Sequence, residues 1–575
     1  MSYLTEYQVW NESPSLSQDE RDELLALAGN DEELKSRFFG PLEFGTAGLR
    51  GIMGVGLNRM NRHVIRHATQ AFAEVILEEG QAAAKSGVAI CFDCRNQSSD
   101  FAREAACVMA GNGISVRLFS SMRPTPELSF AVREYGCTAG INVTASHNPK
   151  EYNGYKVYWS DGAQLPPHHA SAIAKKMTEL NVFTSIQSMD YAKACQEGLI
   201  TLLSEETDAR FLSEVMAMAN DRDVVKRVAD RFTMVYTPFH GTGYQQIPHV
   251  LTELGIQNLY CVPEQMIIDG NFPSVTSPNP ENYASFALAI QLAKEKKADF
   301  ILGSDPDADR VGILVRNKDS AYQMITGNQT GVLLLDYLIQ AKTRTGTMPQ
   351  HPVALKTIVT TNLARKVAEQ HGVSCFDTFT GFKFMAEKKN QLEEAGQGQV
   401  IFSYEESFGY MLGDYVRDKD AVTAALLLTE MAAYYFGRGM TLLDALDALY
   451  ETYGYHEELT LNLMMPGLEG MENMKALMVR LRKEPITHIA GVPVLLQTDY
   501  QDGTILDRRT GTLSSSELSG SNVLKYHLED GTDLLVRPSG TEPKVKVYIL
   551  AQDKDRTLCH QRVTQYARWA EESLT

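Results

Sequence analysis

The fold class is decided by one apolar run and the segment behind it: Val88-Ala89-Ile90-Cys91-Phe92 precedes a helical pattern from about Ser99 to Ala110. The same order, a short β-rich run before a loop or helix, recurs at Phe232 to Tyr236 and at Phe300 to Leu302. Strands that alternate with helices of about 10 to 15 residues are typical of α/β domains with parallel or mixed sheets. Ligand-binding residues of such domains collect in loops after the carboxyl ends of the strands. We therefore expect an α/β fold with its chemistry in those loops.

The chain is too long for one hydrophobic core. It has 575 residues, of which 44% are hydrophobic and 22% charged, an ordinary composition for a globular enzyme. A strongly helical stretch from Ala421 to Thr452 precedes a different, smaller module. We predict four domains, with the boundaries 1–207, 208–322, 323–452 and 453–575.

The charge of the chain limits its partners. The formal net charge is −18, which argues against sequence-independent binding to nucleic acid or to an anionic membrane. The N-terminus shows no basic segment followed by an apolar one, and no run of about 18 apolar residues occurs. The cysteines are scattered and form neither a disulfide framework nor a zinc pattern. We expect a cytoplasmic protein that binds neither nucleic acid nor membrane.

A hydroxyl follows one predicted strand, in the run Thr144-Ala145-Ser146-His147-Asn148-Pro149, here called the serine loop. A serine on a strand-end loop exposes its hydroxyl in a fixed direction. From these residues alone, a serine that only caps local structure is an equally good interpretation.

Three carboxylates alternate in the acidic loop, residues 304–310, which reads Ser304-Asp305-Pro306-Asp307-Ala308-Asp309-Arg310. They converge on one hard cation if the loop curls. The pattern is not an EF-hand, because Arg310 stands where the glycine belongs and Arg316 where the last glutamate belongs. A solvated acidic turn is the other alternative. Ligands made only of oxygen favour Mg²⁺ over zinc.

Two more loops carry polar groups. The Glu-Glu-Ser loop, residues 403–410, contains Glu405 and Ser407, which suit hydrogen bonding to a polyol. The Arg-Pro-Ser loop, residues 537–544, offers the fork of Arg537 and nearby hydroxyls to an anion. A plain surface turn is the alternative for each. The nucleotide phosphate loop, the serine-hydrolase elbow and the zinc-protease helix motif are all missing from the sequence.

Taken together and in this order, the four loops resemble those of the α-D-phosphohexomutase superfamily. The family patterns T-[AG]-S-H-N-P, D-x-D-x-D-R and R-x-S-G-T match fully, whereas Tyr404 replaces the glycine of G-E-x-S. The family's F-G-T-x-G-x-R segment matches residues 44–50. The Glu405-Glu406-Ser407-Phe408-Gly409 form and the segments Thr380–Lys383 and Arg417–Asp420 are most similar to the bacterial α-phosphoglucomutase branch, which also contains phosphopentomutase-like members. The resemblance implies three related α/β domains with mixed sheets and a smaller C-terminal α+β domain around a central cleft.

The resemblance also implies a mechanism. Ser146 would carry a phosphoryl group to a hexose monophosphate, which passes through a glucose 1,6-bisphosphate intermediate that also serves as activator. Mg²⁺ would be bound by Ser146 and the three aspartates: Asp305, Asp307 and Asp309. Lys156 and Lys419 are the candidate acid–base groups, and Arg50 and His147 would assist at the serine. Substrate contacts would come from Arg310, Thr380, Gly381, Lys383, Glu405, Ser407, Arg417, Arg537, Ser539, Gly540 and Thr541.

The resemblance therefore predicts a phosphoglucomutase that interconverts α-D-glucose 1-phosphate and D-glucose 6-phosphate. A phosphopentomutase or phosphomannomutase of the same superfamily is the nearest alternative. A non-catalytic scaffold relative is a remote one, because such a protein is expected to lose the serine or a carboxylate. A small phosphosugar is the expected partner, and we expect a monomer or a weak homo-oligomer.

Overall fold

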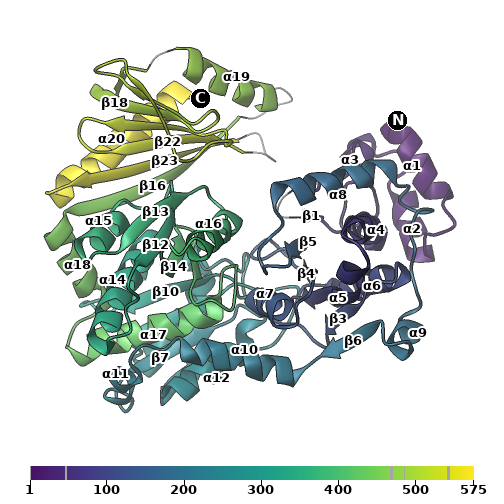
Figure 1. Cartoon of the computed structure of the whole chain (residues 1–575), viewed down its shortest axis with the longest axis horizontal. Coiled ribbons are helices and arrows are strands. Elements are labelled where there is room, and N and C mark those ends of the chain that lie inside the picture. The colour runs from purple at the N-terminus through teal and green to yellow at the C-terminus, as the bar shows by residue number, and fades with distance from the viewer. Residues whose placement is uncertain (1, 46–47, 466–469, 485, 540–543, 575) are drawn as a thin grey trace. The chain divides into compact units, whose positions relative to one another are not determined.

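The computed structural model describes residues 2–45, 48–465, 470–484, 486–539 and 544–574, and the path of the chain is drawn in Figure 1. The chain divides into two compact units. The first contains residues 1–325 and 407–439, and the second contains residues 326–406 and 440–575. Among the described residues, no helix is long and apolar enough to cross a membrane.

The first unit begins with a mixed sheet in the strand order β1-β5-β4-β2-β3-β6. Strands β2, β3, β4 and β6 run parallel, whereas β5 pairs antiparallel with both β4 and β1. The strands span Leu49–Ile52 (β1), Val88–Phe92 (β2), Val116–Phe119 (β3), Ala139–Val143 (β4), Tyr152–Trp159 (β5) and Ile200–Leu203 (β6). The predicted strand at Val88–Phe92 is confirmed, and the helix expected from about Ser99 to Ala110 is α6, Ser98–Gly111.

Helices pack around this sheet because this packing removes their apolar faces from water. Long helix α4 is buried along most of its length and packs against α6 and α8. The helices of this part span Tyr3–Glu12 (α1), Gln18–Ala26 (α2), Asp31–Phe38 (α3), Arg62–Glu78 (α4), Gln81–Ser86 (α5), Thr125–Glu134 (α7), Pro167–Glu179 (α8) and Tyr191–Gln196 (α9).

A second mixed sheet of the first unit has the order β11-β10-β9-β7-β8. Strands β9 and β10 form an antiparallel hairpin in which Ser304 pairs with Val311, so the acidic loop is the hairpin turn. The strands span Thr233–Thr237 (β7), Asn258–Cys261 (β8), Phe300–Ser304 (β9), Val311–Arg316 (β10) and Tyr322–Ile325 (β11). The helices span Glu205–Ala217 (α10), Arg222–Lys226 (α11), Gly243–Leu254 (α12), Tyr283–Phe286 (η1) and Ala287–Lys296 (α13).

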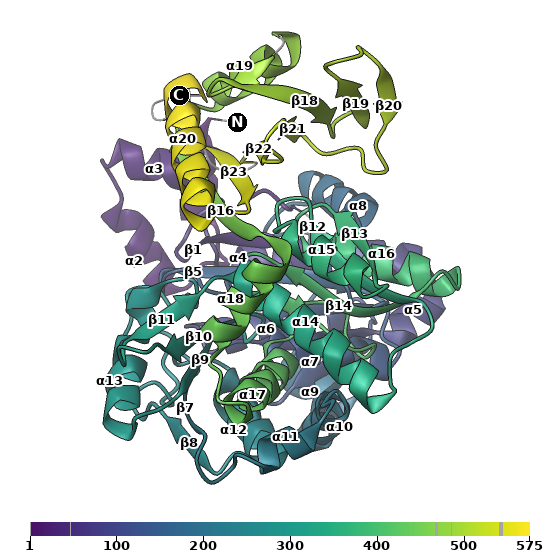
Figure 2. The ribbon, with the colours of Figure 1, turned by 90° about the vertical axis from the view of Figure 1, so that its left-hand side faces the viewer.

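A later segment returns to this unit. It contains β15 (Gly409–Met411) and the apolar helix α17 (Ala421–Gly437), which is buried over nearly its whole length. Helix α17 packs against α12, as Figure 2 shows, and also contacts β9 and β10. The first residues of α17 therefore start close to the acidic loop.

The second unit contains another α/β layer and a largely antiparallel C-terminal sheet. In the α/β layer, β12 pairs parallel with β13 and with β14. Its elements span Gly327–Thr345 (α14), Pro352–Thr357 (β12), Leu363–Gln370 (α15), Ser374–Thr378 (β13), Phe382–Glu394 (α16), Gln399–Glu405 (β14) and Leu442–Tyr453 (α18).

The C-terminal sheet has the order β16-β23-β22-β21-β18-β19-β20, with β17 paired to β18. Helices α19 and α20 pack on it over the core that includes Tyr526, Val536 and Tyr566. Its elements span Tyr455–Met464 (β16), Gly470–Lys483 (α19), His488–Ile489 (β17), Val492–Asp499 (β18), Thr504–Asp507 (β19), Leu513–Ser515 (β20), Leu524–Leu528 (β21), Asp533–Pro538 (β22), Lys544–Asp553 (β23) and Arg556–Leu574 (α20). The α/β layers and the C-terminal α+β sheet confirm the predicted fold class.

Candidate functional site

The serine loop leaves β4 in a backbone conformation that fixes the position of Ser146. Ser146 has a φ of 51°, in the left-handed region that few residues other than glycine adopt. Its N–H donates to Thr144 Oγ1 at 2.9 Å, and its side chain is buried. The Ser146 hydroxyl donates to Asp305 Oδ2 at 2.7 Å. The structure therefore joins the serine loop to the acidic loop, which excludes a purely local capping role for Ser146.

Arg95 holds the serine loop from the end of the neighbouring strand β2. Its guanidinium donates to the carbonyl oxygens of Ser146 and Asn148, each at 2.5 Å, and to those of Pro149 at 2.9 Å and Tyr152 at 3.1 Å. The side chain is buried. Our sequence interpretation missed this residue, although an arginine three residues after a buried strand, on the edge where parallel β2 and β4 both end, was a usable signal.

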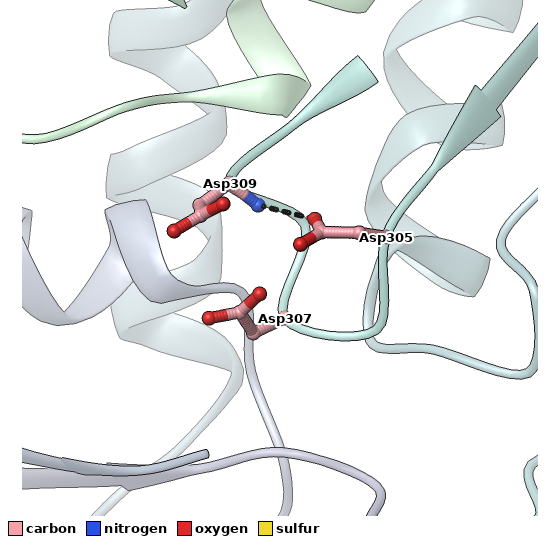
Figure 3. Close-up of side chains that lie close together, drawn as sticks. All are labelled: Asp305, Asp307 and Asp309. Atoms are coloured by element: carbon pink, nitrogen blue, oxygen red, sulfur yellow. Dashed lines mark hydrogen bonds between the residues drawn. The ribbon is translucent and has the colours of Figure 1, made fainter. Parts of the chain in front are cut away.

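The acidic loop curls so that its three carboxylates converge, as Figure 3 shows. One oxygen from each of Asp305, Asp307 and Asp309 lies within 4.8 Å of the others, and all three side chains are buried. Asp305 Oδ1 accepts from the backbone N–H groups of Asp309 and Arg310, both at 3.0 Å. The predicted convergence is present, and the solvated-turn alternative is excluded by the burial.

Neighbouring segments brace the backbone of the acidic loop from two sides. The N–H of Thr242 donates to Pro306 O at 2.8 Å, and a Cβ on Gly241 would come within 2.4 Å of Pro306 Cα, so that position needs glycine. On the other side, the N–H of Ala421 donates to Ala308 O at 3.2 Å. These contacts hold the loop in one shape.

Hydrogen bonds occupy both oxygens of Asp305 and one oxygen each of Asp307 and Asp309. Asp307 Oδ2 accepts from Lys156 Nζ and Thr125 Oγ1, both at 2.8 Å, and Asp309 Oδ2 lies 3.2 Å from Lys419 Nζ. The other oxygens, Asp307 Oδ1 and Asp309 Oδ1, are buried and accept no hydrogen bond from the described residues. Unsatisfied buried carboxylate oxygens are costly unless a cation binds them. The donor set therefore fits a hard divalent cation.

The electrostatics of the cluster lead to the same conclusion. Burial, together with the charges of Asp307 and Asp309, raises the pKa of Asp305 well above its ordinary value. Burial also acts to raise the pKa of Asp307, but the Lys156 ammonium and hydrogen bonds lower it overall. A cation between the carboxylates would therefore favour the ionised form of Asp305.

Two lysines reach the acidic loop from different elements. Lys156 comes from β5, and Lys419 comes from the turn before α17, where Asp420 caps the helix. Both ammonium groups lie near Asp309 Oδ2, at 3.4 Å for Lys156 and 3.2 Å for Lys419. Asp418 also accepts from Lys419 Nζ at 3.1 Å. The structure thus brings together the two predicted acid–base candidates.

The remaining predicted residues of the first unit lie around this cluster. His147 Nδ1 is 3.2 Å from Ser146 Oγ, and burial and the nearby arginines hold the pKa of His147 well below its usual range. Arg50 donates to Asn148 Oδ1 at 3.0 Å. The Arg310 guanidinium pairs with Glu281 at 2.7 Å. Arg417 pairs with Asp414 at 2.8 Å, and Ser407 is half-buried.

The second unit carries the other predicted substrate residues. Glu405, at the end of β14, is buried and accepts from the Gly381 N–H at 2.5 Å, so Thr380–Lys383 lies beside the Glu-Glu-Ser loop. The Lys383 ammonium lies 4.6 Å from the ring centre of Phe384, and burial lowers the pKa of Lys383.

Arg537 and Ser539 are half-buried at the end of β22, and Gly540 and Thr541 lie outside the described residues. Tyr548, in β23, interacts with Arg537 and with the charge of Glu406. Burial and the charge of Glu406 raise the pKa of Tyr548 to about 12, whereas the charge of Arg537 and its hydrogen bond to Tyr548 act to lower it. Tyr548 was not predicted from the sequence, because nothing in strand β23 alone distinguishes it from a core tyrosine.

A buried hydroxyl beside three carboxylates and two ammonium groups is an arrangement suited to phosphoryl transfer, which depends on positioning and charge stabilisation. Models of the phosphoglucomutase/phosphomannomutase family match the chain. The alpha/beta/alpha domains I, II and III match residues 41–182, 210–318 and 326–453, and the C-terminal domain matches residues 478–558. The chain therefore belongs to the phosphoglucomutase/phosphomannomutase family, which confirms the predicted resemblance.

Individual relatives agree with this assignment. The chain is 35% identical over 518 residues to a phosphoglucomutase of Staphylococcus saprophyticus, covering 90% of this chain and 92% of the relative. It is 34% identical to a phosphoglucomutase of Staphylococcus aureus strain N315, with coverage of 90% and 91%. Two crystal structures share the fold with a TM-score of 0.65. One is a putative phosphomannomutase from Thermus thermophilus, 21% identical, with coverage of 92% and 99%; the other is the phosphoprotein pp63/parafusin from Paramecium, 17% identical, with coverage of 93% and 95%.

Proposed function

We propose that the chain is a phosphoglucomutase that interconverts α-D-glucose 1-phosphate and D-glucose 6-phosphate. The observation that carries this proposal is the Ser146 hydroxyl, 2.7 Å from Asp305 Oδ2 at the edge of a carboxylate cluster. The phosphoglucomutases of Staphylococcus, to which the chain is 34–35% identical over most of its length, support the glucose assignment.

In the proposed reaction, Ser146 carries the phosphoryl group. The bond between phosphorus and Ser146 Oγ breaks as a sugar hydroxyl oxygen bonds to phosphorus. The proton of that hydroxyl is passed on to Ser146 Oγ, which becomes a hydroxyl again. The resulting glucose 1,6-bisphosphate turns around and returns its other phosphoryl group to Ser146. We propose Lys156 and Lys419 as the pair that moves the proton, because both ammonium groups lie beside Asp309 next to the serine.

The cation we propose for the acidic loop is Mg²⁺, bound by Asp305, Asp307, Asp309 and the phosphorylated Ser146. When bound, it would neutralise charge on the transferring phosphoryl group. Arg95 keeps the serine loop in shape, and Arg50, Arg310 and His147 supply polar groups around the phosphoryl oxygens.

The bisphosphate needs a second attachment point while its ends exchange. We propose that Glu405 and Ser407 bind sugar hydroxyls near the middle of the ring. The Arg-Pro-Ser loop would hold the phosphate that does not react, through Arg537, Ser539, Gly540 and Thr541. Further contacts are assigned to Thr380, Gly381, Lys383 and Arg417. We also propose that the chain has four domains, with the boundaries 1–207, 208–322, 323–452 and 453–575.

The direct test is the intact mass of the purified protein together with its activity. We expect a phosphorylated fraction whose modification maps to Ser146, and we expect Ser146→Ala to lose both this fraction and mutase turnover. Full activity in Ser146→Ala would overturn the mechanism.

A substrate panel separates the members of the class. Values of kcat/KM for glucose, mannose, ribose and deoxyribose 1-phosphates should favour glucose. A preference for pentose phosphates of about tenfold or more would contradict the glucose assignment and leave the phosphoryl-transfer proposal intact. Contacts in a binding pocket readily produce a preference of this size.

A further inference from the structure

Thr125 contacts the acidic loop but has no place in the mechanism described above. It is the first residue of α7 and is fully buried. Its hydroxyl donates to Asp307 Oδ2 at 2.8 Å, and its backbone N–H donates to Asp307 O, also at 2.8 Å. A single residue therefore holds both the side chain and the main chain of Asp307.

The hydroxyl of Thr125 is itself oriented by a second buried residue. Asn142 Nδ2 donates to Thr125 Oγ1 at 2.7 Å, and Asn142 is also fully buried. A hydroxyl that accepts from Asn142 directs its own proton to Asp307. Asn142 lies in β4, the strand that leads into the serine loop, so this strand positions Ser146 and also starts a hydrogen-bond chain to the acidic loop.

The backbone around Thr125 leaves it little freedom. Proline residues at 124 and 126 restrict their own φ angles. Arg123 forms a two-pronged ion pair with Asp208, at 2.7 and 2.8 Å, and Glu127 accepts from Gln246 Nε2 at 2.5 Å. Anchors on both sides thus fix the position from which Thr125 reaches Asp307.

These contacts determine which oxygen of the Asp307 carboxylate is left to bind a cation. Asp307 Oδ2 is occupied by Thr125 and Lys156, whereas Asp307 Oδ1 is buried without a hydrogen-bond partner among the described residues. We propose that Thr125, oriented by Asn142, is a positioning residue that turns Asp307 so that Oδ1 binds the catalytic cation. This inference rests on the proposed cation site. Partners that orient ligating carboxylates typically change metal affinity or activity by about 10- to 100-fold when they are removed.

The test compares substitutions that separate the hydroxyl from the methyl group of Thr125. Thr125→Val keeps the volume and removes the hydroxyl, whereas Thr125→Ser keeps the hydroxyl and removes a methyl group. Thr69→Val is the matched control, because the Thr69 hydroxyl is equally buried and is hydrogen-bonded to Ile65 O at 2.7 Å and Tyr155 Oη at 2.9 Å, both outside the acidic loop. Mn²⁺ alone is the probe, and its Kd is measured on the full chain by the electron paramagnetic resonance signal of the free ion, alongside thermal unfolding.

We expect Thr125→Val to raise the Kd for Mn²⁺ by about 10- to 100-fold and to lower kcat more than it changes KM for the sugar phosphate. Thr125→Ser and Thr69→Val should stay within about threefold of the unsubstituted protein in Kd, even where they unfold at a lower temperature. Asn142→Leu, which cannot donate to Thr125, should give an intermediate increase in Kd and keeps the test decisive if Thr125→Val does not fold.

Two other outcomes would be distinguishable. An unsubstituted protein that binds Mn²⁺, with Thr125→Val or Asn142→Leu binding it equally well, would overturn the positioning role alone. An unsubstituted protein that binds no Mn²⁺ would overturn the proposed cation site and, with it, the role of Thr125.

Discussion

The Ser146 region and the region proposed to bind the sugar phosphate, which contains Glu405, Arg537 and Ser539 and is here called the sugar-recognition region, are built differently. Around Ser146 the side chains of the three aspartates are buried, and hydrogen bonds occupy the carboxylate oxygens except Asp307 Oδ1 and Asp309 Oδ1. In the second unit, Arg537 and Ser539 are half-buried, and Glu405 accepts a hydrogen bond from the Gly381 N–H. Groups that stabilise developing charge act best when they are already oriented, whereas groups that bind a sugar must be reachable by it. The difference predicts different kinetic consequences for substitutions in the two regions.

The largest effect is expected for Asp307→Asn in the Ser146 region. The amide would present N–H groups to Lys156 and Thr125 or to the cation, so one set of contacts is lost in either orientation. We expect kcat to fall by about 10³-fold, a size typical for the removal of one electrostatic stabiliser. Steady-state kinetics at saturating Mg²⁺ measures it, with the exposed Asp319→Asn as control. A variant with near-normal kcat would break the assignment of the acidic loop as the centre of the chemistry.

A smaller effect in the same region is expected for Arg95→Lys. Lysine keeps the charge but cannot span the four carbonyl oxygens that the planar guanidinium reaches. Displacement of Ser146 should lower kcat by about 10²-fold, since small misplacements of reacting groups have costs of this order. The KM for the sugar phosphate should change little.

The control for Arg95→Lys is Arg117→Lys. Arg117 also donates to a backbone carbonyl, that of Ser86 at 3.0 Å, but it lies in β3 away from the serine loop. Equal losses in kcat for the two variants would mean that Arg95 acts only through stability.

The sugar-recognition region should respond differently to Glu405→Gln. Glutamine can still accept from the Gly381 N–H, so the loop stays in place, but the charged acceptor proposed for the sugar hydroxyls is lost. We expect kcat/KM for glucose 1-phosphate to fall by about tenfold, the value of one hydrogen bond to a charged group. The phosphorylated fraction of Ser146 in the purified protein should not change.

The exposed Glu394→Gln in the same unit is the matched control for Glu405→Gln. If Glu405→Gln instead removed the phosphorylated fraction and left KM unchanged, the division of labour between the two regions would be wrong.

The sequence allowed much of this to be predicted, but not all. The strand β2, the α/β class and the convergence of the three aspartates follow from local patterns, because a strand end and a repeated Asp are visible within a few residues. The role proposed for Ser146 follows instead from the family resemblance, since its local sequence suits a capping serine equally well. Arg95 and Thr125 were missed, since their partners lie 51 and 182 residues away and no local pattern marks them. A long-range hydrogen bond becomes predictable only when the fold has brought its partners together.

The helical stretch from Ala421 to Thr452 shows a similar limit in predicting how elements pack. The structure divides it into α17 and α18, and Gly439 with a φ of 74° lies between them. The two helices belong to different units, with α17 in the first and α18 in the second. Helical periodicity predicts the helices, but it does not say which core each of them covers.

The smallest effect is expected for Glu127, a buried polar residue of the first unit that is not part of the proposed catalytic site. Burial and the neighbouring Asp208 raise the pKa of Glu127 well above its ordinary value, so the folded protein holds a proton there that the unfolded chain releases. The stabilisation that this proton provides is fully present below about pH 4.5 and is lost as the pH rises through the pKa of Glu127 in the folded protein. The equilibrium constant for unfolding rises by at most a factor of about ten for each pH unit. Glu127→Gln imitates the protonated form and still accepts from Gln246. Thermal unfolding at about pH 5 and about pH 8 should therefore show a smaller pH-dependent loss for the variant than for the unsubstituted protein, with mutase activity retained. If the unfolding temperatures of the two proteins changed with pH in the same way, Glu127 would not hold this proton, and the proposal for Ser146 would be unaffected.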